Sequence, residues 1–531
     1  MLNSTRFAMS IWNKITSKLN MKRRDLISAT SLAAFAPATL AQAPKPQRRP
    51  NILFLMTDQQ RGDCVGADGN AIIRTPNMDR IAREGVLFKC AYSSTPTCTP
   101  ARTALLTGLS PWHHGMLGMT AMAQSYPLEK PRALRDAGYY TITVGKQHFA
   151  PMRNGHGYHR MILDEHCPCG NGPQALAAAE RKGPVERSDY ESWFYSQAPS
   201  LDPHATGLWW NDYPSKPFAL PERLHPTTWT GDTAVNFLDT WGGQQPFFLK
   251  VSFIRPHSPY DPPERFMKMY ENVKLPEAKV GKWAEKYEPR NSKRPDIWHG
   301  KLSAAEIRRS RQGYYGCISQ VDEQIGRIFH TLEQRGWLED TLILFTSDHG
   351  DMTGDHNLWR KSYAYESSAR IPMMMRWPES FLNAKRGITM TQPVELRDVL
   401  PTFLEAAGTK PSQPIDGRSL LGLVRDGGVG WREFIDLEHD VCYSPSNHWN
   451  ALTDGHWKYI FHAMDGAEQL FNLDKDPHEL KDLSATNGVE LQRWRQRMVV
   501  HFAERGDAFV KDGKLQLRPK AMMNGPLFPR S

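Results

Sequence analysis

Residues Cys98 to Arg102, with the sequence CTPAR, bring together a thiol, the start of a helix and a cation. Pro100 suits the first turn of a helix, where its missing N–H costs no hydrogen bond, and Thr99 is a suitable cap. The helix predicted over ARTALLT would end at Gly108. An oxyanion held at Cys98 would then meet free backbone N–H groups and the Arg102 guanidinium, one turn along the same face. A buried cysteine before an amphipathic helix is the alternative, and position alone favours it.

Four apolar runs supply elements that could position further reactive groups. Each run reads as a strand buried on both faces: Ile52 to Met56, YYTITV, PFFLKVSFI and DTLILFTS. The residues that end them are Asp58 and Gln59, Lys146 and His148, His257, and Asp348 and His349. Singly, an aspartate after a strand is more often a turn residue, and a lone histidine is more often structural. Four such endings together favour one shared functional site.

Helical patterns lie between these runs. They are TPNMDRIAREG, YPLEKPRALRDAGY, TGDTAVNFLDTW and YYGCISQVDEQIGRIFHTLEQRGW. Strands alternating with helices predict an α/β fold, with a large, mostly parallel sheet and helices on both faces. Ligands bind beyond the carboxyl ends of the strands in such sheets, which is where the polar residues stand.

The bulk composition excludes several classes of protein. The 531 residues are 40% apolar and 23% charged, and the formal net charge is +9. This is an ordinary globular balance, and the basic excess fits a solvated surface or the attraction of an acidic substrate. No zinc-finger spacing or other nucleic-acid module is present. No run of eighteen uncharged apolar residues occurs either, so we expect no nucleic acid partner and no stable membrane insertion.

The N-terminal region has the features of an export signal. MKRRDLISATSLAAFAPATLAQA runs from Met21 to Ala43, with a twin-arginine pair at Arg23 and Arg24, a short apolar run and small residues at its end. Residues 1–43 are therefore predicted to be a twin-arginine signal region, and a buried N-terminal helix is the alternative. This predicts a bacterial protein exported to the periplasm or the exterior, with the twin-arginine machinery as a partner. Seven cysteines, among them Cys167 and Cys169, permit disulfides there, but the sequence does not define their pairing.

The composition shifts between residues 405 and 432, where Gly, Pro and Ser accumulate. We interpret this stretch as a linker or loop belt. Beyond it, WNALTDGHWKYIFHAMDGAEQLFNLDKD alternates apolar and polar residues, with turns at Asp454-Gly455 and Asp465-Gly466. A helical pattern follows in VELQRWRQRMVVHFAERG. The chain is thus divided into a catalytic domain, residues 44–430, and a C-terminal subdomain, residues 431–531, with a small antiparallel sheet and a helix.

CTPAR followed by TALLTG resembles the cysteine-type sulfatase signature, Cys-x-Pro-x-Arg with a downstream Leu-Thr-Gly. The resemblance extends through PNILFLMTDQ, GKQH, RPHSPY, SDHGDMTGDHNLWRKS and the late DGHWKYI segment. It is a resemblance to type I sulfatases of the alkaline phosphatase superfamily, and among these to bacterial polysaccharide sulfatases. It implies an alkaline phosphatase-like fold and the hydrolysis of sulfate esters, with a sulfated carbohydrate as substrate.

The resemblance also implies a modified nucleophile. In that family a maturation enzyme that reads the motif oxidises the cysteine, here Cys98, to formylglycine. One hydroxyl of the hydrated aldehyde attacks sulfur and displaces the alcohol. The other hydroxyl then loses its proton, the C–O bond breaks, and sulfate leaves as the aldehyde is restored.

By the same resemblance, ten residues receive roles. Asp58, Gln59, Asp348 and His349 match the metal ligands, with Cys98 beside them, and their oxygen-rich set suits Ca2+, with Mn2+ or Mg2+ as alternatives. Lys146 and Lys361 match the sulfate-binding lysines, and Arg102 supports the hydrated aldehyde. His148 matches a residue that hydrogen-bonds the hydrate, and His257 the general acid on the leaving alcohol. His356 lies close by in GDHNLW and is either a supporting or a structural residue.

Two positions depart from the commonest family pattern. Many sulfatases have a second Asp where Gln59 stands and an Asn where His349 stands. The pairs in this chain look more like those of choline sulfatases and phosphonate monoester hydrolases. A phosphonate or phosphate ester hydrolase on the same scaffold is therefore one alternative, and a catalytically silent carbohydrate-binding protein is another.

Several aromatic and basic residues in loop-like regions would suit a sulfated sugar by stacking and charge pairing. Ordinary packing is the alternative for each of them singly, so they stay outside the predicted site. They are Trp209, Trp210, His225, Arg255, His448 and Trp449.

Overall fold

The computed structural model describes residues 49–165, 186–445 and 447–529, which belong to one compact unit. The signal region predicted over residues 1–43 lies outside the described residues, as do Cys167 and Cys169. Among the helices that the structure describes, none combines the length and apolar character needed to cross a bilayer.

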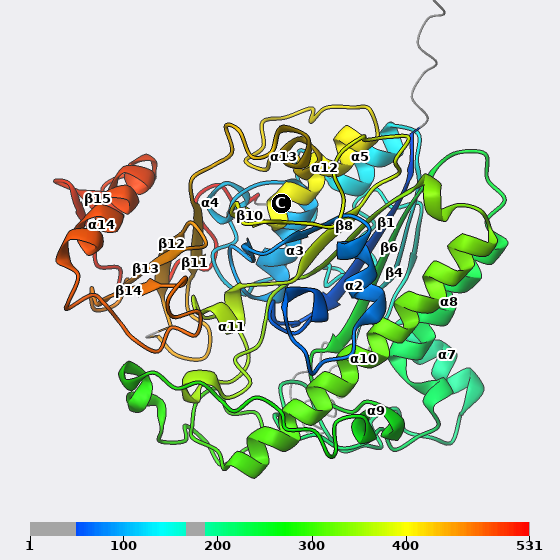
Figure 1. The fold of residues 1–531 in the computed structure, drawn as a ribbon, viewed down its shortest axis with the longest axis horizontal. Coiled ribbons are helices and arrows are strands. Elements are labelled where there is room, and N and C mark those ends of the chain that lie inside the picture. The colour runs from blue at the N-terminus through cyan, green and yellow to red at the C-terminus, as the bar shows by residue number, and fades with distance from the viewer. Residues whose placement is uncertain (1–48, 166–185, 446, 530–531) are drawn as a thin grey trace, which may run out of the picture. The chain divides into compact units, whose positions relative to one another are not determined.

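The main sheet has eight strands in the order β5-β4-β6-β1-β7-β8-β2-β9 (Figure 1). Neighbouring strands are parallel except at β8, which runs antiparallel to both β7 and β2. This confirms the predicted mostly parallel sheet. The strands are β1 Asn51–Asp58, β2 Val86–Phe88, β4 Tyr140–Gly145, β5 Arg160–Ile162, β6 Phe247–Pro256, β7 Thr341–Ser347, β8 Met373–Arg376 and β9 Ile388–Met390.

The four strands predicted to end in polar residues are adjacent. β1 lies between β6 and β7, so that Leu55 pairs with Val251 on one side and Phe345 on the other. β4 pairs with the far side of β6. All four run parallel, and their carboxyl ends therefore lie at one edge of the sheet.

Both faces of the sheet are covered by helices, which explains the continuous apolar runs. Ile52, Phe54 and Met56 pack on one side, and Leu53 and Leu55 on the other. The helices on the first face are α3 Cys98–Thr107, α5 Lys130–Asp136, α12 Val399–Ala406 and α13 Leu420–Asp426 (Figure 1). Those on the second face are α2 Pro76–Arg83, α8 Pro226–Thr240 and α10 Ala304–Gln334.

Helix α3 starts two residues earlier in the sequence than predicted. Its cap is Thr97, in extended conformation and without a side-chain hydrogen bond, and Cys98 is its first residue. The predicted cap at Thr99 is wrong, because Thr99 already lies inside the helix. The predicted end is confirmed, since Gly108 adopts a φ of 72°, which a residue without a Cβ adopts at no steric cost.

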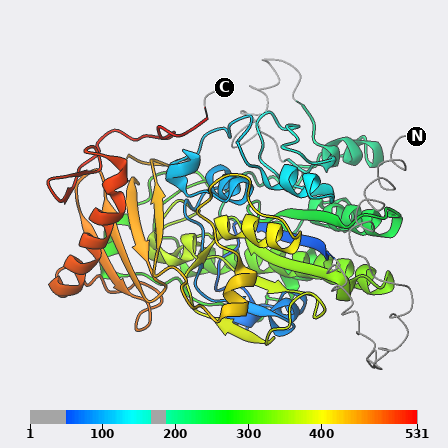
Figure 2. The same cartoon turned by 90° about the horizontal axis from the view of Figure 1, so that it is seen from above.

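The C-terminal segment forms the expected small antiparallel sheet (Figure 2). Its strands are β11 Ile435–His439, β12 Trp449–Thr453, β13 Trp457–His462 and β14 Glu468–Asn472. One face, which includes Trp449, packs against Tyr363 and Tyr365 of the main sheet's loops. The other face packs against Trp494 and Met498 of α14 Gly488–Phe502.

The linker prediction over residues 405–432 is wrong in its middle. This segment contains α13, and Leu420, Leu421 and Leu423 are buried in the main core.

The remaining short elements are α4 Pro111–His114, α7 Asp189–Gln197, α9 Glu264–Lys268, α11 Glu366–Ala369, the pair β3 Ala91–Tyr92 and β10 Val394–Glu395, and the pair β15 Val510–Lys511 and β16 Lys514–Leu515.

Candidate active site

Cys98, Asp58, Asp348 and His349 meet at the carboxyl edge of the main sheet. Their ligand atoms all lie within 4.8 Å of one another, and all four side chains are buried. Asp58 ends β1, Asp348 and His349 follow β7, and Cys98 opens α3. Because β1 and β7 are paired in parallel, residues separated by nearly three hundred positions in the chain become neighbours.

Two lysines and a histidine complete this cluster. Lys361 Nζ lies 3.4 Å from Cys98 Sγ and 2.7 Å from His257 Nε2. Lys146 Nζ lies 4.0 Å from Cys98 Sγ and 2.5 Å from Asp58 Oδ2. The ends of β4 and β6 thus contribute to the same site as β1 and β7, with cations on two sides of the sulfur atom.

The electrostatic surroundings favour an anion at Cys98. Burial opposes ionisation of the thiol, and so does the nearby Asp58 carboxylate, but Lys146, Lys361 and His349 outweigh both. They hold the pKa of Cys98 well below its usual value. Cys98 is one of five cysteines among the described residues, and none of the five forms a disulfide.

Gln59 is oriented by a residue that the sequence analysis missed. Its backbone is left-handed, with a φ of 71°, and its N–H donates to Asp348 Oδ1 at 3.0 Å. Its side-chain Nε2 donates to Asp351 Oδ2 at 2.5 Å, which turns Oε1 toward Lys361 Nζ at 2.9 Å. Asp351 therefore fixes the amide so that its oxygen faces the cluster. The only hint in the sequence is the second aspartate of SDHGD.

The cluster fits a divalent cation. His349 Nδ1 donates to the Gly350 carbonyl at 2.9 Å, so the lone pair of its Nε2 points into the cluster. That nitrogen lies 3.6 Å from carboxylate oxygens of both Asp58 and Asp348. A lone pair facing two carboxylates is repulsive unless a proton or a cation lies among them. Two carboxylates, one imidazole and the inward-facing Gln59 oxygen form a donor set of the kind that hard cations prefer.

Arg102 ties the two carboxylates together. Its Nη2 lies 2.9 Å from Asp348 Oδ2 and 3.3 Å from Asp58 Oδ2, and its Nη1 donates to the Lys146 carbonyl at 2.7 Å. The guanidinium thus contacts residues from three strand ends. Its contacts favour a role in holding the carboxylates, in addition to the predicted support of a group at Cys98.

His257 is neutral in this arrangement. Its Nδ1 lies 2.8 Å from the Ser258 carbonyl, which requires a proton on Nδ1, and its Nε2 accepts from Lys361. Burial, followed by the charge of Lys361, holds its pKa well below the usual value.

Two further histidines from the sequence analysis, His148 and His356, have different surroundings from His257. The His148 backbone N–H donates to Glu165 at 2.7 Å, while its Nδ1 is buried without a hydrogen-bond partner. His356 packs on Trp283, with ring centroids 4.6 Å apart, and its Nδ1 accepts from Gly281 at 3.2 Å. These contacts indicate a structural role for His356.

Of the aromatic and basic residues left outside the predicted site, Trp210 contacts the cluster. Its ring lies 3.8 Å from the His257 ring, centroid to centroid, and Lys146 Nζ lies 4.3 Å from the indole. The others pack mainly elsewhere: Trp209 on His204, His225 and Arg255 near Asp261, His448 on Asp440, and Trp449 with its Nε1 donating to the Ser362 carbonyl. Arg255 also donates to the backbone carbonyl of His257, at 3.5 Å.

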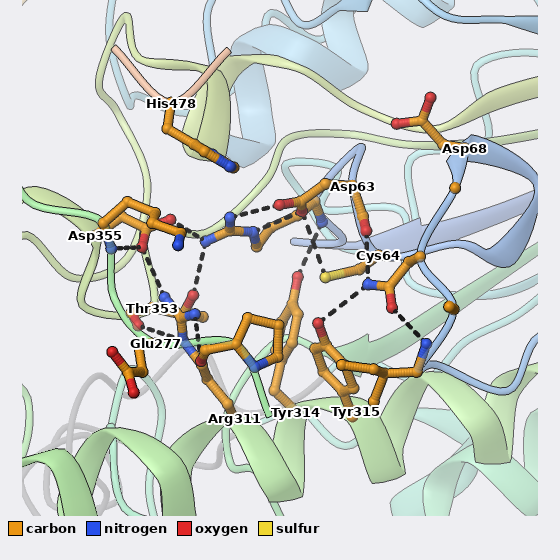
Figure 3. Close-up of a pocket in the computed structure, with 17 residues that line it drawn as sticks. Asp63, Cys64, Asp68, Glu277, Arg311, Tyr314, Tyr315, Thr353, Asp355 and His478 are labelled. Carbon is orange, nitrogen blue, oxygen red and sulfur yellow. Dashed lines mark hydrogen bonds and ion pairs between the residues drawn. The ribbon is translucent and has the colours of Figure 1, made fainter. Parts of the chain in front are cut away.

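A cavity of about 460 Å³ adjoins the other side of the Asp58–Gln59 turn, and none of the ten predicted residues lines it (Figure 3). Its charges are largely paired: Arg61 contacts Asp63 and Asp355, and Arg311 also contacts Asp355, each at 2.7 Å. Tyr314 on its wall donates to the Gln59 carbonyl at 2.6 Å. The Tyr314 contact braces the turn at Gln59 from the cavity side.

The chain is similar to known proteins over most of its length. A family model described as Sulfatase matches residues 50–409, and one described as N-sulphoglucosamine sulphohydrolase, C-terminal, matches residues 354–504. The arylsulfatase of Clostridium perfringens is 37% identical over 455 residues, covering 85% of this chain and 92% of that protein. The N-acetylglucosamine-6-O-sulfatase of Bacteroides thetaiotaomicron is 24% identical, covering 86% and 87% respectively.

Among solved structures, the phosphonate monoester hydrolase of Agrobacterium radiobacter is similar throughout. It superimposes with a TM-score of 0.69 at 27% identity, covering 87% of this chain and 97% of that one.

Proposed function

Since this chain belongs to the sulfatase family and is a sulfuric ester hydrolase, we propose that it removes O-sulfate from a carbohydrate, with Cys98 converted to formylglycine beside a bound divalent cation. The observation that carries this proposal is the contact of Cys98 with His349 and Lys361 beside the two carboxylates, all of them buried. A sugar substrate is supported by the relative that acts on N-acetylglucosamine 6-sulfate.

The residues divide between binding and proton transfer. Lys146 and Lys361, on two sides of Cys98 Sγ, bind the sulfate oxygens and neutralise charge that develops in the transition state. His257 protonates the leaving alcohol once it has gained a proton on Nε2, the atom now facing Lys361. His148, with its free Nδ1, hydrogen-bonds the aldehyde hydrate.

Asp58, Asp348, His349 and the oxygen of Gln59 would hold the cation, with residue 98 beside them. We favour Ca2+, with Mn2+ or Mg2+ as alternatives, because three of the four ligands supply oxygen. When bound, such an ion polarises a sulfate oxygen and favours ionisation of the hydrated aldehyde. Arg102 keeps Asp58 and Asp348 in position for it.

The chain also requires two partners before it acts. A formylglycine-generating enzyme would modify Cys98, and the twin-arginine machinery would export the folded product to the periplasm or beyond. The support for these partners is the CTPAR motif and the Arg23-Arg24 pair of the predicted signal.

Mass spectrometry of the peptide that contains Cys98, combined with assays on sulfated mono- and oligosaccharides, tests the proposal. Material from a host with competent maturation machinery is expected to carry the aldehyde at position 98 and to release sulfate. Cys98→Ala is expected to lower kcat by about 10³-fold or more, since the nucleophile is lost. Cys90→Ala, at a cysteine that lines a cavity away from the cluster, serves as the matched control. Full turnover in the Cys98→Ala variant would rule out the mechanism.

A phosphonate ester hydrolase is the second candidate. It is favoured by the similarity to the Agrobacterium enzyme and by the Gln59 and His349 pattern. Comparing kcat/KM for 4-nitrophenyl sulfate and a 4-nitrophenyl phosphonate ester decides between them. We expect the sulfate to be the better substrate, and a large preference for the phosphonate would reverse the assignment.

A further inference from the structure

Trp210 is a partly buried aromatic side chain in contact with two of the reacting groups. Lys146 and His257, against which it lies, are 2% and 0% exposed, while Trp210 itself still meets solvent. Its indole therefore lies between these two side chains and the surface of the protein. A molecule that reaches them along this side of the site passes beside the ring.

The loop that carries Trp210 is fastened to the strand end that carries His257. The Asn211 N–H donates to Ser258 Oγ at 2.7 Å, and Asn211 adopts a left-handed φ of 72°. Beyond it, the Tyr213 N–H donates to the Pro295 carbonyl at 2.9 Å. These bonds hold the indole at a fixed place relative to His257, as a rigid wall for binding requires.

The two contacts of the indole define which part of a substrate meets it. In the proposed function, on which this inference rests, Lys146 binds the sulfate and His257 protonates the departing oxygen. The indole that touches both therefore adjoins the ester oxygen, on the side of the alcohol. The first carbon atoms of the alcohol would then lie within reach of the indole.

We propose that Trp210 determines specificity for the leaving alcohol, by packing its indole against a ring directly bonded to the ester oxygen or one carbon away from it. An apolar ring face, of a sugar or an aryl group, gains contact area and dispersion energy there. A short acyclic alcohol covers little of the indole and gains little. Trp210 is thus a binding residue for the alcohol and takes no part in proton transfer.

Steady-state kinetics of Trp210→Ala on two kinds of ester test this assignment. The ring esters are 4-nitrophenyl sulfate and N-acetylglucosamine 6-sulfate, and the acyclic ester is ethyl sulfate. We expect kcat/KM for the ring esters to fall about tenfold, mainly through KM, while kcat/KM for ethyl sulfate changes less than threefold. Trp210→Phe, which keeps an aromatic face, is expected to recover most of the loss.

Trp209→Ala is the matched control, because this neighbouring indole stacks on His204, with centroids 4.9 Å apart, and not on His257. It is expected to leave both classes of ester unchanged. An equal loss on ring and acyclic esters in Trp210→Ala would show a merely structural role, and no loss on either would show that the alcohol binds elsewhere. Both outcomes overturn the inference. If the wild-type protein hydrolyses none of these esters, the proposed function itself fails.

Discussion

The His257–Lys361 contact sets a condition on catalysis at the scale of single residues. With Nδ1 bonded to the Ser258 carbonyl, His257 can receive a catalytic proton only on Nε2, which now accepts from Lys361. An anionic sulfate that draws the Lys361 ammonium toward itself removes this competition and favours the imidazolium. In the proposed mechanism, substrate binding would therefore prepare His257 as the general acid.

His257→Ala should consequently affect poor leaving groups most. A sugar alkoxide needs a proton as it departs, whereas 4-nitrophenolate leaves readily without one. We expect kcat for a sugar sulfate to fall about 10²-fold or more, and kcat for 4-nitrophenyl sulfate to fall less than tenfold. Equal losses on both esters in steady-state assays would contradict an acid role.

The residues that sequence reasoning found and missed differ in kind. Asp58, Lys146, His257 and Asp348 each follow an apolar strand, and parallel strands bring their ends together, so the spacing alone predicted a common site. Asp351 and Trp210 contact site residues that are far away in the chain: Asp351 contacts Gln59, and Trp210 contacts His257. No periodicity encodes such contacts, because they depend on how loops return to the sheet edge.

At the scale of elements, helix α5 begins with a buried lysine. Lys130 Nζ has no hydrogen-bond partner and lies 4.5 Å above the Phe54 ring. Burial lowers the pKa of Lys130 to about 7, and the positive end of the helix is itself a poor place for a cation. Because the unfolded chain binds this proton far more tightly, the residue destabilises the fold increasingly as the pH falls from about 10.5 toward 7.

Lys130→Met should therefore stabilise the protein. Methionine fills similar space without a charge, and we expect the free energy of unfolding at pH 7 to rise by about 2–4 kcal/mol. Denaturant unfolding measures this change. Lys268→Met, at an exposed lysine in α9, is the control and should leave stability nearly unchanged. Destabilisation of Lys130→Met would show that its contacts with the rings outweigh the burial.

Helix α4 ends in a buried histidine, His114, which also makes the stability of the fold depend on pH. His114 is buried, its Nδ1 accepts from the Met116 N–H at 3.1 Å, and its Nε2 has no partner. Burial, and then the charge of Arg397, lowers the pKa of His114 to about 3, while Asp416 opposes the shift. In the unfolded state this histidine therefore binds a proton near pH 6.5, whereas in the folded state it does so only near pH 3. The free energy of unfolding falls as the pH falls through this window.

His114→Asn should remove this dependence while keeping an acceptor for Met116. Between pH 7.5 and 5, the wild type is expected to lose about 2 kcal/mol more of its free energy of unfolding than the variant. Denaturant unfolding of both proteins at the two pH values provides the comparison. Parallel pH profiles would mean that His114 does not titrate in this range.

At the scale of the whole molecule, the site joins segments that are remote in sequence. A cation held by Asp58 and Asp348 would cross-link β1 and β7, the centre of the main sheet. Ligands that bind only the folded state stabilise it in proportion to the logarithm of their concentration.

The sheet order was not predictable from the strands alone, because many orders satisfy the same apolar pattern. Only the convergence of their ends restricted the choice.

Removal of divalent cations should lower the thermal midpoint of the wild-type protein. At a hundredfold excess of metal over its Kd, binding adds about 2.7 kcal/mol, which corresponds to a shift of a few degrees. Differential scanning fluorimetry with a chelator, followed by addition of Ca2+, measures the loss and its recovery. Asp348→Ala should have a midpoint that no longer responds to either treatment.

The burial of Cys98 fixes an order of events in the life of the protein. With 1% of its surface exposed, this side chain is out of reach of any other enzyme once α3 has docked on the sheet. The proposed oxidation must then happen while the polypeptide is still open, before β7, made from residue 341 onward, closes over the site. A chain that folds before the maturation enzyme has acted would keep an unmodified Cys98. Adding that enzyme later would not restore activity.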